Sequence, residues 1–356
     1  MKKFQKMFAI LALIALSAVM LSACQALGGE EGAPYTIGIS NPFISSEYRT
    51  QMIDELIETN AEYMELGLTE ELVIESFDTD VAGQIEQIES LMNQGVDAML
   101  VNPGDAVALN QILEEAVEQG IIVISMDQEI EAEGVINVGH DQYEWASISA
   151  EWFAETLQEG DVVLIEGFIG HPANNLRMEA VYDTFENYPG INVLASESGF
   201  WDEATGQQVM SDFLAAFPNL NGYWTQDGMA IGALEATIAA DPDPFPLVVG
   251  EGRVKFLQLW NEMLERNPDF ETIAVANSPG VNSNALRIVV EMLDGRTLDE
   301  SQLAGQYGTT LVMPIPVVVT PENFDEIYAE YQDFPDSYLL SGIMTRDEVI
   351  DQYFTD

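Results

Sequence analysis

The sequence predicts an α/β protein built from two similar lobes, each a doubly wound parallel sheet. The first observation is that, beyond Pro34, short apolar runs alternate with amphipathic stretches of roughly 12 to 20 residues, a pattern typical of strands and helices in a parallel sheet. The second is that this series occurs twice with the same rhythm, the second beginning after a short strand near Val135. The third is the length of 356 residues, which suits two domains of ordinary size.

The first series starts with an apolar strand at 35–40. Ser45 or Ser46 is placed to cap the helix that follows, which reaches about Leu66. By the same alternation we predict further strands at 72–76, 98–102 and 121–126, and helices at 81–93 and 106–119. These elements complete one doubly wound half.

The second series repeats the pattern after a short strand at 135–138. It opens with a helix at 145–157 and a strand at 161–166. We predict its other helices at 175–187, 205–217, 230–239 and 254–266, and its other strands at 193–196, 222–225, 247–250 and 272–276. Open parallel sheets bind ligands at the carboxyl ends of their strands, so the loops at those ends are where we expect function.

The composition excludes some partners and fits others. The chain has 61 acidic and 11 basic residues and a formal charge of −50, which excludes nucleic acid as a partner. A hydrophobic content of 47% argues against disorder, so we expect the acids to form a solvated surface that keeps an extracellular protein soluble.

The N-terminus has the parts of a secretory signal. Lys2, Lys3 and Lys6 precede an apolar stretch at 8–20, and small residues precede Cys24. The stretch is too short to cross a bilayer comfortably, since about 20 apolar residues are needed. With Cys24 the single cysteine, no disulfide, thiol nucleophile or cysteine metal site is expected.

This N-terminus resembles bacterial lipoprotein signals. The resemblance implies that residues 1–23 are a signal peptide that is removed, that Cys24 is lipidated, and that residues 24–34 are a linker. Two or more acyl chains anchor a protein stably. We therefore expect a lipid-anchored protein on the extracytoplasmic face of the cell membrane.

The loops at the predicted strand ends combine planar polar groups with aromatic residues. A sugar needs this mixture, because each hydroxyl group both donates and accepts hydrogen bonds and the C–H faces pack on aromatic rings. Single Asp and Asn residues at strand ends are also common helix caps, and a single Trp is often a core residue. The residues in question are Asn41, Phe43, Asp127, Gln128, Asn174, Asn175, Arg177, Trp201, Gln226 and Asp227.

From Tyr35 to about Glu322 the chain resembles the type I periplasmic sugar-binding proteins of ABC importers, of the ribose-binding kind. The segments that carry the resemblance are 37–43, 94–98 with 102–103, 123–127 and, most strongly, 193–234. It implies that the protein is not an enzyme, that an ABC permease is its partner, and that a small sugar or polyol (a pentose or hexose among them) is its ligand. It also implies ligand-binding roles for Asn41, Phe43, Asp127, Arg177, Trp201, Gln226, Asp227 and Asn277.

The sequence departs from the family pattern at positions that bear on the ligand. Gln128 and Asn175 stand where ribose binders have arginines, and Glu251-Gly252-Arg253 replaces a segment that carries a ligand aspartate. These differences argue against D-ribose itself and leave Gln128 and Asn175 as candidate ligand amides. Arg253 is either a site residue or a surface cap, and the sequence does not choose.

The resemblance also implies a division into lobes. We expect lobe 1 at 35–139 plus 277–315 and lobe 2 at 140–276 plus 316–356, with the chain crossing between them three times. Closure of the hinge around a ligand is the expected motion.

Several other interpretations were weighed. Asp78, Asp80, Gly83 and Glu89 match part of a calcium-binding loop, but the spacing also fits a strand-to-helix turn. His140 and His171 have no partners that can be named for a metal site, so we expect neither metal nor cofactor. A sensory protein that feeds a receptor kinase would share every feature above, and a lipid-anchored glycoside-acting enzyme is the other alternative. We expect a monomer.

Overall fold

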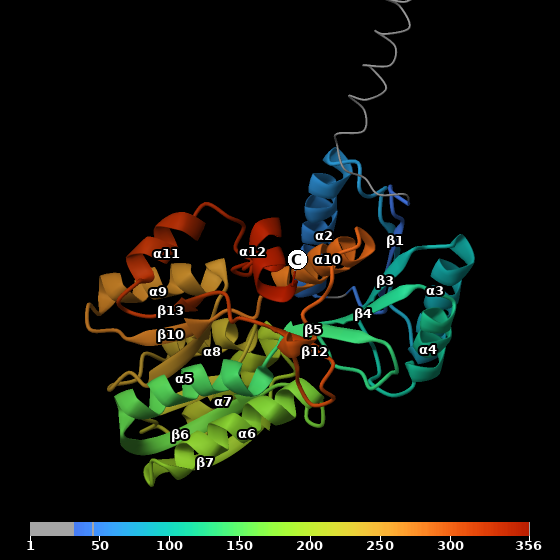
Figure 1. Cartoon of the computed structure of the whole chain (residues 1–356). Helices are drawn as coiled ribbons and strands as arrows, with labels where there is room; N and C mark the ends of the chain where they lie inside the picture. The colour runs from blue at the N-terminus through green and yellow to red at the C-terminus, as the bar shows by residue number, and fades with distance from the viewer. Residues whose placement is uncertain (1–31, 45, 356) are drawn as a thin grey trace, which may run out of the picture.

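The computed structural model describes residues 32–44 and 46–355 and has two α/β lobes side by side (Figure 1). The predicted signal peptide, Cys24 and most of the linker lie outside the described residues. In the part that is described, no helix is long and apolar enough to span a membrane.

Lobe 1 is built on a seven-stranded sheet in the order β11-β12-β5-β4-β3-β1-β2, in which only β11 is antiparallel to its neighbour. Its strands are β1 (Ile37–Asn41), β2 (Val73–Ser76), β3 (Ala98–Val101), β4 (Ile122–Met126), β5 (Ile136–His140), β11 (Leu303–Ala304) and β12 (Thr310–Met313). The helices packed on it are α2 (Glu47–Glu65), α3 (Val81–Gln94), α4 (Asn110–Glu118), α10 (Gly280–Leu293) and α12 (Arg346–Tyr353), and a 3-10 turn, η1 (Glu300–Gln302), precedes β11.

Lobe 2 is built on a six-stranded sheet in the order β13-β10-β9-β8-β6-β7, in which only β13 is antiparallel to its neighbour. Its strands are β6 (Glu159–Glu166), β7 (Gly190–Ser198), β8 (Gly222–Thr225), β9 (Leu247–Glu251), β10 (Thr272–Val275) and β13 (Val318–Val319). Its helices are α5 (Gln142–Leu157), α6 (Pro172–Glu186), α7 (Glu203–Ala216), α8 (Met229–Ala240), α9 (Val254–Arg266) and α11 (Phe324–Tyr331).

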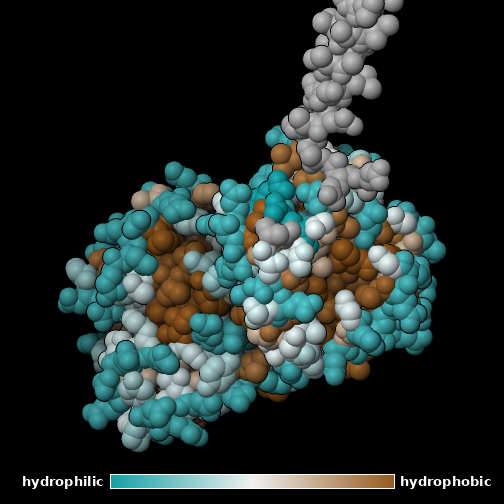
Figure 2. All heavy atoms as spheres, viewed as in Figure 1, coloured by the Kyte–Doolittle hydropathy of each residue, from teal (hydrophilic) through white to brown (hydrophobic). Residues whose placement is uncertain are grey.

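Each sheet is covered on both faces, which explains the continuous apolar runs of its strands. In lobe 1, Ile37 and Leu100 face a core shared with α2, α10 and α12, whereas Met99 and Val101 face α3 and α4. Lobe 2 has the same two-sided arrangement. On the face shown in Figure 2, hydrophilic residues border both lobes, and hydrophobic residues are visible in the middle of each.

Local signals in the sequence set the helix starts. Ser46 caps α2 by accepting a hydrogen bond from the backbone N–H of Arg49. Asp80 caps α3 by accepting one from the N–H of Gly83 at 3.0 Å, and Asp78 accepts one from the N–H of Ile44 at 2.8 Å. The segment that partly matches a calcium-binding loop is therefore a strand-to-helix turn, which was the other interpretation of its spacing.

The predicted fold class, two doubly wound lobes of the type I binding-protein kind, is confirmed by these two sheets. The chain passes between the sheets after β5, after β10 and after β12. It then returns to lobe 1 between Leu340, which is buried in the second core, and Met344, which packs against the first.

The fourth passage corrects part of the predicted division, because the sequence analysis assigned all of 316–356 to lobe 2. Val349, Tyr353 and Phe354 are instead buried in the core of lobe 1, and the Tyr353 hydroxyl donates to the carbonyl oxygen of Val312 at 3.0 Å. The C-terminal helix α12 therefore belongs with lobe 1 (Figure 1).

Candidate functional site

The candidate site lies between the lobes, where the carboxyl ends of both sheets bring loop residues together. Three of its residues have left-handed backbone conformations: φ is 69° at Asp127, 55° at Trp201 and 50° at Asp227. Non-glycine residues adopt this region rarely, and such strain concentrates at functional sites when the surroundings enforce it.

Several contacts hold the Trp201 ring in place. Its edge-on neighbours are Phe168, with ring centroids 5.2 Å apart, and His171, at 4.9 Å. The indole Nε1–H donates to Oε1 of Gln226 at 2.9 Å. The ring also lies on Gly167, where an added Cβ would come within 2.2 Å of it, so only glycine leaves room for this ring position.

Arg177 joins the polar residues of lobe 2. Its guanidinium lies over the Trp145 ring, 4.1 Å from the centroid, and Nε donates to Oε1 of Gln142 at 2.8 Å. Nη1 donates to Oε1 of Gln226 at 3.0 Å and to Oδ2 of Asp227 at 2.6 Å. These contacts fix the charged group while only 2% of its side chain is exposed.

Asn277, at the crossing between lobes that follows β10, completes the group around Asp227. Its Nδ2 donates to Oδ1 of Asp227 at 3.2 Å, so both carboxylate oxygens of that residue are engaged. The Asn277 Oδ1 is buried without a hydrogen-bond partner among the described residues.

In lobe 1 the central residue is Asp127, at the end of β4. Arg49 Nη2 donates to its Oδ2 at 3.0 Å, and the Tyr48 hydroxyl donates to its Oδ1 at 3.3 Å. Burial, and after it the charge of Asp127, raises the pKa of Tyr48 well above its ordinary value, so the phenol stays a donor.

Arg253 connects the two lobes. Its Nη1 donates to Oε2 of Glu47 at the start of α2, and its Nη2 donates to Oε1 of Glu251 at 3.0 Å. Burial raises the pKa of Glu251 to about 7, although the charge of Arg253 acts in the opposite direction. The side chain therefore bridges the two lobes beside the candidate site.

His171 also lies where the lobes meet. Burial lowers its pKa, while the charge of Asp127 on the opposite lobe acts to raise it. The imidazole of this residue accepts a hydrogen bond from the backbone N–H of Ala173 at 3.3 Å and thereby caps α6. It therefore begins the helix that carries Arg177 and also packs against the Trp201 ring.

A family model described as a periplasmic binding protein domain matches residues 37–297. The chain belongs to this family. It is 30% identical over 190 residues to the D-ribose/D-allose-binding protein of Pseudomonas aeruginosa, covering 51% of this chain and 59% of that one. It is 26% identical over 274 residues to the xylitol-binding protein of Mycolicibacterium smegmatis, covering 75% and 74%. An ABC transporter solute binding protein from Thermobispora bispora has the same fold, with a TM-score of 0.75 at 22% identity, covering 89% and 94%.

The structure brings together most of the residues that the sequence analysis named. Asp127, Arg177, Trp201, Gln226, Asp227 and Asn277 belong to the hydrogen-bonded groups described above. Gln226 is fully buried, so it acts on other site residues and not at the site surface.

The other four named residues stand outside these groups. Asn41 is buried, and its Nδ2 donates to the Phe43 carbonyl oxygen at 2.8 Å, while the Phe43 ring itself is about half exposed. The side chains of Gln128 and Asn175 form no hydrogen bonds to the described residues, and Asn175 is exposed.

Sequence reasoning missed Tyr48 and Arg49 as site residues. Both lie in the first turn of α2, beyond the loop that follows β1. One signal was available in the sequence. Gln128 stands where ribose binders have an arginine beside the aspartate, so an arginine from another element could be expected to pair with Asp127. Arg49 is that arginine.

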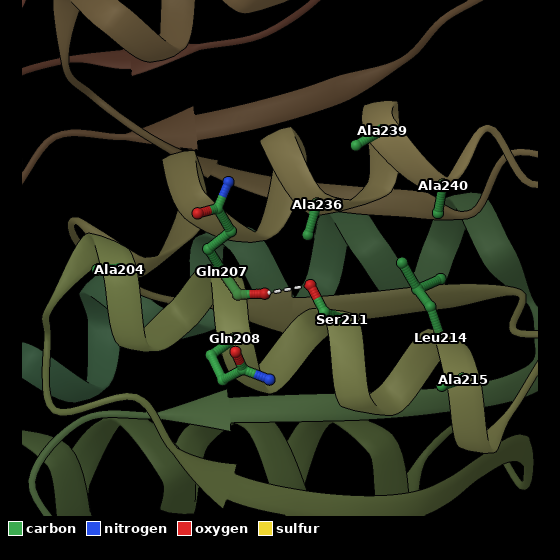
Figure 3. A pocket seen from close by; sticks show the side chains of 9 residues that line it. All are labelled: Ala204, Gln207, Gln208, Ser211, Leu214, Ala215, Ala236, Ala239 and Ala240. Carbon is green, nitrogen blue, oxygen red and sulfur yellow. Dashed lines mark hydrogen bonds between the residues drawn. The ribbon is translucent and has the colours of Figure 1, made fainter.

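Neither a metal site nor the detected pocket coincides with this site in the part of the chain that the structure describes. Within residues 32–44 and 46–355, no three His, Cys, Asp or Glu side chains are placed to hold a metal ion. A pocket of about 530 Å³ lies between α7 and α8, lined by Gln207, Gln208, Ser211 and several alanines (Figure 3). It contains none of the site residues.

Proposed function

We propose that this protein is a lipid-anchored, extracytoplasmic receptor that binds a neutral sugar or polyol between its lobes and delivers it to an ABC permease. Membership of the periplasmic binding protein family supports a binding role and not a catalytic one. The named ligands of the relatives, ribose, allose and xylitol, are all small uncharged polyhydroxy compounds. No observation favours a receptor-kinase role or glycoside chemistry over this one.

The observation that carries the proposal is the placement of two paired carboxylates, Asp127 and Asp227, on opposite lobes, with the Trp201 ring centroid 6.0 Å from the guanidinium that pairs with Asp227. Carboxylates accept hydrogen bonds from hydroxyl groups, and an aromatic ring packs on the C–H face of a sugar. A ligand held by both lobes stabilises their closed arrangement.

The charges at the site favour an uncharged ligand. Arg49, Arg177 and Arg253 each pair with a carboxylate at the site, so none is left as an isolated positive charge for an anion. The chain as a whole carries a formal charge of −50, which repels anions over a longer range. Sugar acids and sugar phosphates are therefore poor ligands in this proposal.

An unpaired acceptor at the site suits a hydroxyl donor. Oδ1 of Asn277 has no hydrogen-bond partner among the described residues, although the residue as a whole is only partly buried. Buried polar atoms are nearly always paired in proteins, so such atoms at the mouth of a binding site mark where ligand groups donate. The Nη2 group of Arg177, which forms no hydrogen bond to the described residues, is the complementary donor.

The proposal includes membrane attachment through Cys24, supported by the sequence of the N-terminal segment. It also divides the chain into lobe 1 (35–139, 277–315 and about 344–355) and lobe 2 (140–276 and 316–340). Replacing Cys24 by Ala should move the protein from the membrane fraction to the soluble extracytoplasmic fraction.

Thermal unfolding of residues 32–356, stripped of endogenous ligand, tests the binding function. A ligand that binds only the folded state raises the unfolding midpoint, by about 2.7 kcal/mol of stability at a hundredfold excess over Kd. We expect a shift from a neutral pentose, hexose or polyol and none from its acid or phosphate. Shifts confined to nucleosides, amino acids or sugar acids would contradict the proposal.

A further inference from the structure

A chain of buried side-chain amides lies behind the Trp201 ring and reaches from the sheet of lobe 2 to the site. Asn174, in the first turn of α6, is 1% exposed, and Gln226, at the end of β8, is 0% exposed. Nε2 of Gln226 donates to Oδ1 of Asn174 at 2.9 Å. Neither residue has the exposure needed to contact a ligand directly.

The backbone determines which end of each amide points where. The N–H of Gly167 donates to Oδ1 of Asn174 at 2.7 Å, and a backbone N–H cannot be anything but a donor. The atom of Asn174 on that side is therefore the oxygen. Since this oxygen also faces Gln226, the end of Gln226 turned toward it is the NH₂ group.

The opposite end of Gln226 is consequently an oxygen, and it faces two further obligatory donors. The Nε1–H of Trp201 and Nη1 of Arg177 donate to it at 2.9 Å and 3.0 Å. If the Gln226 amide were reversed, its NH₂ group would meet both of these donors and its oxygen would meet an acceptor. One orientation is therefore strongly preferred.

Asn174 is itself held by the sheet. Its Nδ2 donates to Oε2 of Glu166 at 3.2 Å, and the Ser196 hydroxyl donates to Oε1 of the same carboxylate at 2.7 Å. Glu166 ends β6 and Ser196 lies in β7, so the network is anchored on two rigid strands.

We propose that Asn174 is a positioning residue for ligand binding: it fixes the orientation of the Gln226 amide, which in turn fixes the Trp201 ring and the Arg177 guanidinium. The hydrogen bonds between Asn174 and Gln226 do not depend on a ligand. Their effect on ligand affinity rests on the proposed function. The residue contributes by pre-organising the site, so it lowers the cost of ordering these groups when a ligand arrives.

Hydrogen exchange at the Trp201 indole N–H, followed by NMR without ligand, measures the arrangement directly. The indole resonance is assigned with the Trp201→Phe variant. In the wild-type protein we expect slow exchange, because Gln226 holds the proton. Exchange as fast as that of an exposed indole would overturn the proposal whatever any variant does.

Two near-isosteric variants separate the parts played by Asn174. Asn174→Leu removes the acceptor that orients Gln226, and we expect indole exchange at least about tenfold faster and ligand affinity about tenfold weaker. Asn174→Asp keeps the acceptor, and at about pH 5, where a proton shared with the Glu166 carboxylate replaces the lost amide donor, it should exchange nearly as the wild type does. Unchanged exchange in the leucine variant, or equal acceleration in both, would mean that the residue only packs.

A matched control and a second variant keep the test decisive. Asn187→Leu changes an exposed asparagine at the end of the same helix and should alter neither quantity. If Asn174→Leu fails to fold, the isosteric Gln226→Met must show the same fast exchange, and slow exchange there would overturn the proposal. A protein that shows the expected exchange but binds no sugar would contradict the proposed function alone.

Discussion

Arg253 of lobe 2 and Glu47 of lobe 1 form an ion pair across the site. Arg253 also contacts Glu251 at 3.0 Å within its own lobe, so the guanidinium is held between two carboxylates. A second inter-lobe contact lies nearby, where the Gln51 amide on α2 exchanges hydrogen bonds of 2.8 and 2.9 Å with the backbone of Leu339. These contacts join the first turns of α2 to the start of α9 and to the segment that leads to α12.

The ion pair is expected to favour lobe contact before ligand arrives. Glu47→Gln removes the charge, and since Glu47 is 55% exposed, the loss is about 0.2–1 kcal/mol. The fraction of binding-competent protein falls, so titration calorimetry should show Kd rising by the same factor, up to about fivefold, for every ligand. Small-angle scattering should show a larger radius of gyration without ligand.

Glu62→Gln is the matched control for this ion pair. Glu62 lies on the same helix and pairs with Arg287 within lobe 1, with 58% of its side chain exposed. Its loss should leave Kd unchanged. A factor that differs strongly between ligands in the Glu47 variant would mean that Glu47 contacts the ligand and does not simply join the lobes.

The buried carboxyl group of Glu251 should make stability depend on pH. Burial raises its pKa from 4.5 to about 7, so between these values the folded protein holds a proton that the unfolded chain has lost. The stability contributed by this group is fully present below about pH 4.5 and is lost as the pH rises through about 7, by at most about 1.4 kcal/mol per pH unit.

Urea unfolding at about pH 5 and about pH 7.5, on wild type and Glu251→Gln, isolates this contribution. The free energy of unfolding of the wild type, minus that of the variant, should decrease with pH, because glutamine takes up no proton. A difference that is constant or that increases with pH would show that Glu251 is ionised throughout.

Removing the carboxylate of Asp127 should weaken binding and leave the fold intact. Asp127→Ala deprives the ligand of an acceptor and leaves Arg49 without its partner, and such losses cost about 2 kcal/mol or more, roughly 30-fold in Kd. Titration calorimetry measures the loss. Asp105→Ala, a change at an exposed loop residue of the same lobe, is the control, and equal affinity in both variants would exclude Asp127 from the site.

The Trp201 side chain is expected to contribute to ligand affinity in two separate ways, through the face of its ring and through its N–H group. Trp201→Ala should cost a large share of affinity, whereas Trp201→Phe keeps an aromatic face and should lose only about 1 kcal/mol, the value of one hydrogen bond. Calorimetry with Trp152→Phe, a partly buried tryptophan on α5, provides the control. Wild-type affinity in Trp201→Ala would remove this ring from the site.

The fold was largely predictable because buried parallel strands are continuous apolar runs. β8 and α9 were placed at their observed bounds on this basis. Helix α10 was not predicted, since its first turns carry Asn and Ser side chains that are buried by tertiary contacts. The lobe of α12 was predicted wrongly because the resemblance implies three crossings, which leave the C-terminal segment in lobe 2, and only packing reveals that its apolar face lies against the core of lobe 1.

Site residues that directly follow a strand were predictable from the sequence, whereas site residues on helices were not. Asp127 and Asp227 follow strands, and their positions were read from the sequence. Arg49 reaches Asp127 from a helix 78 residues earlier in the chain, a pairing that no local pattern encodes. Asn174 was noticed beside Asn175, but only the structure shows that one is buried and the other exposed.

The most direct test is a crystal structure of the protein with the sugar or polyol that most raises its unfolding midpoint. We expect the ligand between the lobes, within hydrogen-bond distance of the carboxylates of both Asp127 and Asp227, with its C–H face on the Trp201 ring. A ligand that contacts only one lobe, or that lies in the pocket between α7 and α8, would contradict the account.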